Sequence, residues 1–309
     1  MKILLTGSSG QVGHALSATL GKLADVELII ADRAHMDLSR LDLVRSTIRD
    51  IQPQLIINPA AYTAVDKAES EPELAQLING EAPGVIAEEA KKLGAALIHY
   101  STDYVFDGSK RDGDGGLLAY TEQDATKPLN VYGRTKLAGE QAIAASGCDH
   151  LIFRTSWVYS NFGKNFLLTM LRLANERDEL KVVNDQWGAP TWAGWIAQAS
   201  TEVVRQVQQV QQLQQAGRQA DWWQQNSGIY NLTPQGHTSW CGFAQEIMQQ
   251  AGARGLLSKA APSVLGIPAS EYPTPATRPV NSTLSGDKLR RQLGIQQPSW
   301  QQALTECLA

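Results

Sequence analysis

The chain has 309 residues, which is long enough for one large α/β domain with a buried core plus a smaller lobe. Its formal net charge of -4 excludes the basic footprint of proteins that bind nucleic acid or anionic membranes, and no apolar run approaches the roughly 20 residues of a membrane helix. The three cysteines, Cys148, Cys241 and Cys307, lack the spacing of a zinc site or a disulfide framework. We therefore expect a cytoplasmic protein that binds neither nucleic acid nor membrane.

Short apolar runs alternate with helix-like stretches, a pattern typical of stacked β-α units. Strands, each apolar throughout as if covered on both faces, are predicted at Lys2–Thr6, Val26–Ala31, Leu55–Asn58, Ala95–Tyr100, Leu151–Thr155 and Leu180–Val183. Helices are predicted at Val12–Leu23, Ser39–Ile51, Glu73–Leu93 and Val131–Ala145, the third with a kink or break at Gly80, Pro83 and Gly84. The predicted fold is α/β: a Rossmann-type, doubly wound parallel sheet with a smaller C-terminal substrate-binding lobe.

A glycine-rich loop, with Gly7, Gly10 and Gly13 at three-residue spacing, joins the first strand to the first helix. Glycines permit the tight turn and the close approach of backbone to a pyrophosphate, and a helix N-terminus supplies N–H donors and a positive dipole. The loop has one residue more between its first two glycines than the standard dinucleotide fingerprint. Its position between strand and helix predicts a dinucleotide site.

Asp32 ends the second strand, close to the roughly 20 residues beyond the glycines where such folds carry an acidic residue. A carboxylate there accepts hydrogen bonds from a ribose 2′-hydroxyl and repels a 2′-phosphate, which favours NADH. Arg33 follows directly and could pair with a phosphate, so use of NADPH stays open. Residues 1–155, with part of 180–235, are predicted to form the NAD(P)-binding domain, and the remainder of 156–309 mainly the substrate-binding lobe.

Two segments interrupt the β-α pattern. Residues 107–127 contain the Gly- and Asp-rich run Gly108–Gly116, which is typical of a surface loop and could be either a lid or a decorated turn. Residues 206–225 are rich in glutamine and fit either a surface helix or a partly disordered insertion. We assign no chemistry to this second segment.

Tyr132 and Lys136 lie four residues apart, on one face of a predicted helix. A nearby ammonium lowers the pKa of a phenol from about 10, as proton transfer at neutral pH requires. Thr102 ends the fourth strand, where a hydroxyl would face the same crevice as the glycine loop and could hydrogen-bond a substrate carbonyl. Ser101 competes with Thr102 for that role, and His99 is interpreted as a packed strand residue.

Taken together, these motifs resemble the extended short-chain dehydrogenase/reductases, and within them the reductases of nucleotide-linked 4-ketosugars. The matching stretches are Gly7–Gly13, Ala60–Glu69, Ser101–Phe106, Asn130–Glu140, Phe153–Tyr159, Asn184–Thr191 and Tyr272–Pro279. They cover nearly the whole chain apart from the two irregular segments.

The resemblance implies a role for each matching residue. Gly10, Gln11 and Val12 would contact the pyrophosphate, Asp32, Asp37 and Leu38 would surround the adenosine, and Ala61, Tyr62, Thr63 and Tyr100 would line the rest of the groove. Thr102, Tyr132 and Lys136 match the catalytic triad, with Lys136 also binding the nicotinamide ribose. Thr102, Asp103 and Trp157 match substrate contacts, although Trp157 alone would be interpreted as a core aromatic.

The activity that the resemblance implies is reduction of the C4 ketone of dTDP-4-dehydro-β-L-rhamnose to dTDP-L-rhamnose by NADH or NADPH. Alternatives are another nucleotide-sugar epimerase, reductase or dehydratase of the superfamily, or a non-catalytic, dinucleotide-binding regulatory subunit. Some members of the family hold a metal between two subunits, but the matching positions here are Ala15, Gly194 and Gln301, which supply no carboxylate. We therefore expect no metal site, and a monomer or a weak homodimer.

Overall fold

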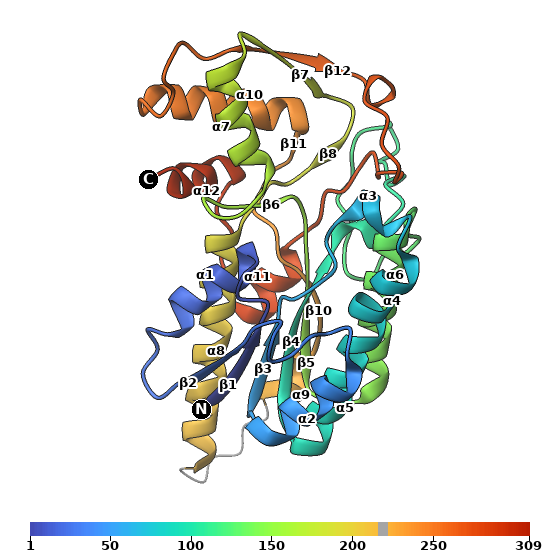
Figure 1. Ribbon diagram of the computed structural model, residues 1–309, viewed down its shortest axis with the longest axis vertical. Coiled ribbons are helices and arrows are strands. Elements are labelled where there is room, and N and C mark those ends of the chain that lie inside the picture. The colour runs from blue at the N-terminus through green and yellow to red at the C-terminus, as the bar shows by residue number, and fades with distance from the viewer. Residues whose placement is uncertain (216–221) are drawn as a thin grey trace.

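The computed structural model describes residues 1–215 and 222–309, which form a large parallel sheet flanked by helices and a smaller lobe beyond one end of that sheet (Figure 1). The sheet has six strands in the order β10-β5-β4-β3-β1-β2, and every neighbouring pair is parallel. Its strands are β1 (Lys2–Thr6), β2 (Glu27–Ala31), β3 (Leu55–Asn58), β4 (Ala96–Thr102), β5 (His150–Thr155) and β10 (Gly228–Asn231). The first five were predicted from the sequence, whereas β10 was not.

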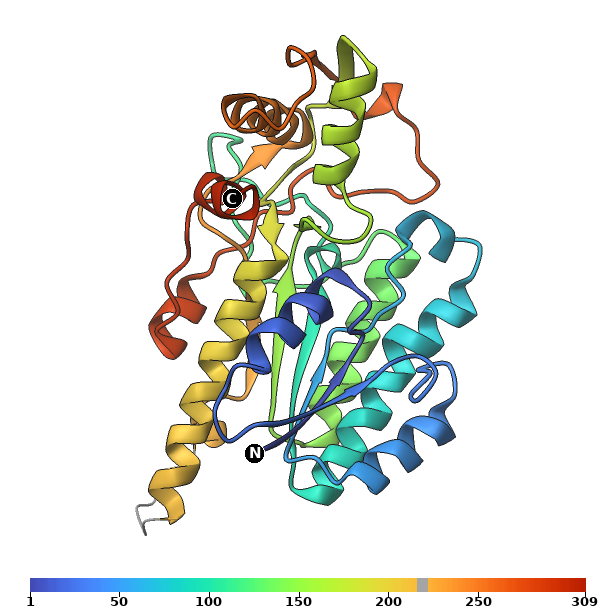
Figure 2. The same cartoon turned by 60° about the vertical axis from the view of Figure 1, so that its left-hand side comes forward.

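Helices cover both faces of the sheet, so the doubly wound arrangement is confirmed (Figure 2). One face packs against α1 (Gln11–Leu20), α8 (Ala193–Gln215) and α11 (Asp287–Leu293), and the other against α2 (Leu41–Ile51), α5 (Ala82–Leu93) and α6 (Val131–Ser146). Successive strand residues serve opposite faces: Leu5 and Ile98 face α1 and α8, whereas Leu4 and Leu97 face α2, α5 and α6.

The helix predicted at Glu73–Leu93 is one continuous run whose hydrogen-bond pattern changes along its length. It consists of α4 (Pro72–Gln76), a π-helical turn (Leu77–Glu81) and α5. The predicted irregularity is therefore a π-helical turn that contains Gly80, and α5 starts with Ala82 and Pro83. π-Helical turns are rare and occur frequently at functional sites.

The smaller lobe is built from helices and two-stranded sheets around its own apolar core. Its helices are α7 (Phe166–Glu176), α10 (Trp240–Ala253) and α12 (Trp300–Cys307), and its paired strands are β6 (Val158–Tyr159) with β9 (Thr191–Trp192), β8 (Trp187–Gly188) with β11 (Thr238–Ser239), and β7 (Glu179–Val183) with β12 (Ser263–Ile267). Short helical segments elsewhere are α3 (Val65–Ala68), α9 (Trp222–Asn226) and 3-10 turns at Asp103–Val105 and Ala269–Glu271.

The strand predicted at Leu180–Val183 forms, as β7, but it does not have the double-sided cover expected from its apolar sequence. It pairs only with β12, outside the six-stranded sheet, and its residues alternate between buried and exposed. The expectation of burial on both faces was wrong because the flanking Glu179 and the interior Lys181 already set an alternating pattern.

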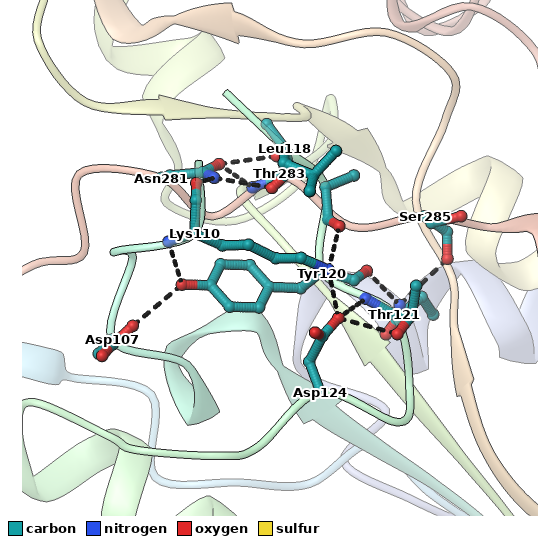
Figure 3. Close-up of polar contacts among 11 residues, drawn as sticks. Asp107, Lys110, Leu118, Tyr120, Thr121, Asp124, Asn281, Thr283 and Ser285 are labelled. Carbon is teal, nitrogen blue, oxygen red and sulfur yellow. Dashed lines mark hydrogen bonds and ion pairs between the residues drawn. The ribbon is translucent and has the colours of Figure 1, made fainter. Parts of the chain in front are cut away.

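The loop at residues 107–127 is fastened to the rest of the protein by polar contacts (Figure 3). Lys110 Nζ donates to Asp124 Oδ2 at 2.6 Å, and Asn281 Nδ2 donates to the carbonyl oxygens of Lys110 and Leu118. The ring of Tyr120 stacks on Phe106 with centroids 4.2 Å apart. Residues 112–116 form its longest run of exposed positions, and exposed and partly buried residues alternate through the rest of the segment. Of the two interpretations of this segment, the structure favours the decorated turn over the lid.

Most of the glutamine-rich segment is helical. Helix α8 continues to Gln215 and α9 begins at Trp222, whereas residues 216–221 lie outside the described part of the chain. Of the two interpretations of this segment, a surface helix describes its first half.

Candidate active site

A cleft of about 590 Å³ runs along the carboxyl edge of the six-stranded sheet, between the sheet and the smaller lobe. It brings together nearly all of the residues singled out from the sequence: Gly7, Gly10, Gln11, Val12, Gly13, Asp32, Asp37, Leu38, Ala61, Thr63, Tyr100, Thr102, Asp103, Tyr132, Lys136 and Trp157. Tyr62 is absent from this lining.

The glycine loop is shaped so that side chains do not fit at two of its positions. Gly7 has φ +59°, and a Cβ there would lie 2.8 Å from the backbone of Ala60; a Cβ at Gly13 would lie 2.1 Å from the carbonyl oxygen of Gly7. Helix α1 begins directly after Gly10 without a side-chain cap, so its first N–H groups are left for a ligand in the cleft. The loop therefore fits the pyrophosphate of a dinucleotide.

Two side chains of the glycine-loop helix reach across to the smaller lobe. Gln11 Nε2 donates to the carbonyl oxygen of Val158 at 3.4 Å, and the Ser160 hydroxyl donates to Gln11 Oε1 at 3.0 Å. His14 stacks on Phe162 with ring centroids 3.9 Å apart. The side chain of Gln11 is thus engaged between the two parts of the protein.

At the far end of the cleft, a carboxylate and a guanidinium lie side by side in the sequence but have different partners. Asp32 accepts hydrogen bonds from the backbone and the ring of His35, which lower the pKa of its carboxyl. Arg33 pairs with Asp37 at 3.3 Å, and its side chain is 80% exposed. Asp32 is therefore ionised at neutral pH, and Arg33 lies mostly in solvent beside Asp37.

Tyr62 turns its side chain away from the cleft. Its hydroxyl donates to Glu71 Oε2 at 2.7 Å, an interaction that raises the pKa of the phenol, and its ring packs with Val131. Asn79, in the π-helical turn, fixes this stretch because its side chain bonds both the N–H and the carbonyl of Tyr62. Sequence reasoning missed Asn79, since only the packed helix shows that its amide reaches the loop after β3.

Helix α6 presents Tyr132 and Lys136 to the cleft from adjacent turns. The Asn130 side chain caps this helix by accepting from the backbone N–H of Gly133. Lys136 is 1% exposed, and its Nζ donates to the carbonyl oxygen of Tyr100 at 2.7 Å and lies 3.2 Å from Nε2 of His99. Burial lowers the pKa of Lys136 to about 8.

The pKa of Tyr132 is shifted in the direction opposite to the one expected from its lysine neighbour. Burial raises it to about 12, although a hydrogen bond with Thr102 acts to lower it. The loss of solvation, together with the charge of Asp103, outweighs the hydrogen bond with Thr102. The phenol therefore holds its proton at neutral pH, which is the form that a proton donor needs.

Three polar groups follow one another at the end of β4. Thr102 Oγ1 contacts Tyr132, accepts from the backbone N–H of Tyr104 and donates to Asp103 Oδ1 at 2.9 Å. Ser101 also lines the cleft, but its buried hydroxyl has no hydrogen-bond partner in the structure. Of the two candidate hydroxyls, Thr102 is therefore the one joined to the tyrosine.

Asp103 is 2% exposed, and burial raises the pKa of its carboxyl to about 7. Its Oδ2 makes no hydrogen bond of normal geometry, although the Ser282 hydroxyl lies close enough to the carboxyl to act against the rise in its pKa. Buried polar atoms are normally hydrogen-bonded, so an unpaired oxygen in the cleft is suited to a ligand hydroxyl.

Trp157 is not a core residue but part of the cleft wall. It adopts φ +48°, which is strained for a bulky side chain, and stacks on Trp240 with centroids 3.6 Å apart and planes 9° apart. A Cβ at Gly188 would lie 2.6 Å from the Trp157 ring, so only glycine fits there. Trp240 and Lys164 also line the cleft; the sequence carried no signal for either, because neither α10 nor the loop before α7 was predicted.

The described residues contain no group of three or more His, Cys, Asp or Glu side chains placed to hold a metal ion. Ala15, Gly194 and Gln301 lie on α1, α8 and α12. No helix in residues 1–215 or 222–309 is both long and apolar enough to cross a membrane.

Comparisons with known proteins identify the family of the chain. The model of the family described as "RmlD substrate binding domain" matches residues 1–309. The dTDP-4-dehydrorhamnose reductase of Burkholderia thailandensis is 45% identical, covering 100% of this chain and 98% of the relative. Two solved dTDP-4-dehydrorhamnose reductases share the fold. The one from Clostridium acetobutylicum is 34% identical, with 100% of this chain and 98% of the other covered and a TM-score of 0.86. The one from Bacillus anthracis, in complex with NADP, is 31% identical, with 99% of this chain and 98% of the other covered and a TM-score of 0.85. The chain belongs to the dTDP-4-dehydrorhamnose reductase family.

Proposed function

We propose that this protein reduces the C4 ketone of dTDP-4-dehydro-β-L-rhamnose to dTDP-L-rhamnose, with NADH or NADPH as reductant. The observation that carries the proposal is one cleft in which the glycine loop, Thr102, Tyr132 and Lys136 meet. The identity of the substrate is inferred from the names of relatives that match over the full length.

The reduced nicotinamide, when bound, supplies the hydride that adds to the ketone carbon. Tyr132 donates its phenolic proton to the oxygen that gains charge, and the Thr102 hydroxyl, once it turns from Asp103 Oδ1 to the substrate, polarises the same oxygen by hydrogen bonding. The ammonium of Lys136 stabilises the phenolate that remains. Asp103 offers its unpaired Oδ2 to a sugar hydroxyl, and Trp157 forms an apolar wall for the substrate.

We propose that the cofactor site accepts both dinucleotides and favours NADH. The ionised carboxylate of Asp32 suits a 2′-hydroxyl and opposes a 2′-phosphate, while the exposed guanidinium of Arg33, the next residue, can compensate by pairing with the phosphate. A relative from Bacillus anthracis that binds NADP supports the acceptance of NADPH.

We further propose a cytoplasmic protein that is a monomer or a weak homodimer. The support for this assembly is that positions 15, 194 and 301, where some family members are expected to carry bridging carboxylates, hold Ala, Gly and Gln.

The deciding experiment follows the absorbance of the reduced cofactor during incubation of the purified protein with the dTDP-4-ketosugar, run separately with NADH and NADPH. We expect cofactor oxidation in step with formation of dTDP-L-rhamnose. An epimerised or dehydrated product without net cofactor oxidation would favour another superfamily enzyme. No turnover, together with co-purification of a larger enzyme, would favour a regulatory subunit.

A further inference from the structure

Three buried polar side chains cross the sheet behind the catalytic lysine. Thr6, Asn58 and His99 come from the adjacent strands β1, β3 and β4, and none is more than 1% exposed. They lie on the same face as Leu4, Ile56 and Leu97, the face covered by α6, because side chains two residues apart on a strand share a face. The row ends at Lys136, where His99 Nε2 lies 3.2 Å from Nζ.

The row occupies one of the three hydrogen-bond positions of the Lys136 ammonium. An ammonium has three N–H donors and no acceptor. One donor is used by the carbonyl oxygen of Tyr100 at 2.7 Å, and His99 stands at a second. The third remains for the cleft. His99 therefore helps to determine the direction in which Lys136 presents its charge.

The imidazole of His99 is neutral, since burial and the charge of Lys136 both lower its pKa. A neutral ring carries one N–H and one lone pair. Asn58 Nδ2 faces His99 Nδ1 at 3.3 Å, and the Thr6 hydroxyl donates to Asn58 Oδ1 at 2.6 Å. In this orientation Nδ1 accepts, so the proton lies on Nε2 and suits a neutral amine at Lys136. The backbone of Asn58 also hydrogen-bonds the ring and acts in the opposite direction, raising the pKa of His99.

Turning the Asn58 amide by 180° reverses every donor in the row. Its oxygen then accepts from Nδ1–H of His99, its nitrogen donates to the Thr6 hydroxyl, and the Nε2 lone pair accepts from the Lys136 ammonium. Both arrangements pair the Asn58 amide with His99 and with Thr6, but the second requires the Thr6 hydroxyl to turn its own proton away from Asn58. They differ in the histidine tautomer and by one proton in total: on conversion to the ammonium form the Nε2 proton passes to Nζ, and Nδ1 gains one proton from solvent.

We propose that Thr6, Asn58 and His99 form a positioning relay that reverses with the proton of Lys136, holding Nζ in place in both forms and supporting its ammonium through the Nε2 lone pair. This inference rests on the proposed reduction for its consequence, because the ammonium stabilises the phenolate left after Tyr132 gives up its proton.

Other ionisable groups around Lys136 do not replace His99. Tyr132 lies one turn away on the same helix, and Glu140 lies one turn further, where its charge raises the pKa of Lys136. Glu140 is itself held in a buried, bidentate pair with Arg154. His99 is therefore the ionisable side chain in hydrogen-bond contact with Nζ among the residues that the structure describes.

The first test needs neither substrate nor mutation. In ligand-free protein labelled with ¹⁵N-histidine, the ring nitrogens of His99 should stay neutral from pH 6 to 9.5, while the proton moves from Nδ1 to Nε2 with a midpoint near the pKa of Lys136, about 8. The signal is assigned by its loss in His99→Gln. A single tautomer over the whole range, or a charged imidazolium, would overturn the relay.

The second test measures turnover against pH. His99→Leu removes the acceptor, so the alkaline limit of kcat should move down by about one pH unit and kcat at pH 8 should fall about fivefold, with little change in the KM of the sugar nucleotide. His99→Gln, whose amide can accept from Nζ, should restore most of the shift. Leu97→Met, on the same face of the same strand, is the packing control.

The outcomes separate this inference from the proposed function. A wild-type pH profile in folded His99→Leu, or an equal shift in Leu97→Met, would refute the relay while leaving the reduction intact. Absence of turnover in the wild-type protein would refute the proposed function, and the tautomer measurement would still decide the relay.

Discussion

Glu89 and Lys136 are both almost completely buried beside the same layer of helices, Glu89 between α2 and α5 and Lys136 between α6 and β4. Three cations contact Glu89: Arg49 at 2.7 Å, Lys92 at 2.7 Å and Arg45 at 3.0 Å. Lys136 contacts a carbonyl oxygen and an imidazole, and no carboxylate of residues 1–215 or 222–309 contacts its Nζ.

The pKa values follow this difference in partners. Hydrogen bonds from the cations lower the pKa of Glu89 to about 2, so its charge is favoured by folding, whereas burial lowers the pKa of Lys136 to about 8, so its charge is opposed by folding. A buried charge that stabilises the fold, such as that of Glu89, is neutralised by its partners. A buried charge that takes part in the reaction, such as that of Lys136, is only partly neutralised and opposes folding. Perturbed groups of the second kind cluster at active sites.

The largest expected effect separates activity from stability at Lys136. Lys136→Met should reduce turnover at least 100-fold, because the phenolate of Tyr132 loses its stabilising charge. The same variant should be at least as stable as the wild type at pH 7. Steady-state kinetics and urea unfolding of both proteins measure the two quantities.

The pH dependence of stability should show that folding opposes the charge of Lys136. The folded-state pKa of Lys136 is depressed from 10.5 to about 8, so folding disfavours the proton and the wild type gains stability as the pH rises from about 8 towards 10.5. The gain relative to Lys136→Met should be at most about 3 kcal/mol. A stability difference between the two proteins that does not vary with pH would contradict an opposed buried charge.

Glu89→Gln should have the reverse effect, lowering stability by about 2–3 kcal/mol while leaving turnover unchanged. The contribution of Glu89 is fully present above its unfolded pKa near 4.5 and is lost as the pH falls through about 2, because its folded-state pKa is depressed. Urea unfolding at pH 7 measures it. Glu88→Gln is the matched control, since Glu88 is half exposed and makes one ion pair.

Several elements of this comparison could be predicted from the sequence, and others could not. The strands β1 to β5, the glycine loop and the pair Tyr132 and Lys136 follow from local periodicity and spacing. Strand β10 has only four residues and includes Gly228 at φ +138°, so its place beside β5 depends on a long-range pairing.

The burial that shifts the pKa values of the site residues could not be predicted from the sequence either. Nothing local distinguishes His99 from a packed core residue, and its contact with Lys136 exists only because α6 lies across β4. The predicted direction of the pKa shift of Tyr132 was wrong for the same reason. Sequence spacing shows a neighbouring charge but not the loss of solvent.

The exposed pair of Asp32 and His35 extends the comparison to a charge that is neither buried nor strongly compensated. Asp32→Ala should change stability little, but it should reduce kcat/KM about tenfold for NADH and leave that for NADPH unchanged or higher. Parallel assays with the two cofactors give the ratio. Equal losses with both would mean that Asp32 does not discriminate at the ribose.

The smallest expected effect concerns Lys110. Its partly buried ammonium stabilises the loop at residues 107–127 by pairing with Asp124 (Figure 3). Lys110→Met should cost about 1 kcal/mol or less, because the pair is partly exposed and the stacked rings of Phe106 and Tyr120 still hold the segment. The KM of the sugar nucleotide should not change, and hydrogen exchange should accelerate only between residues 108 and 120. A raised KM would show instead that this segment closes over the substrate, since a loosened lid weakens binding whereas a loosened surface turn does not.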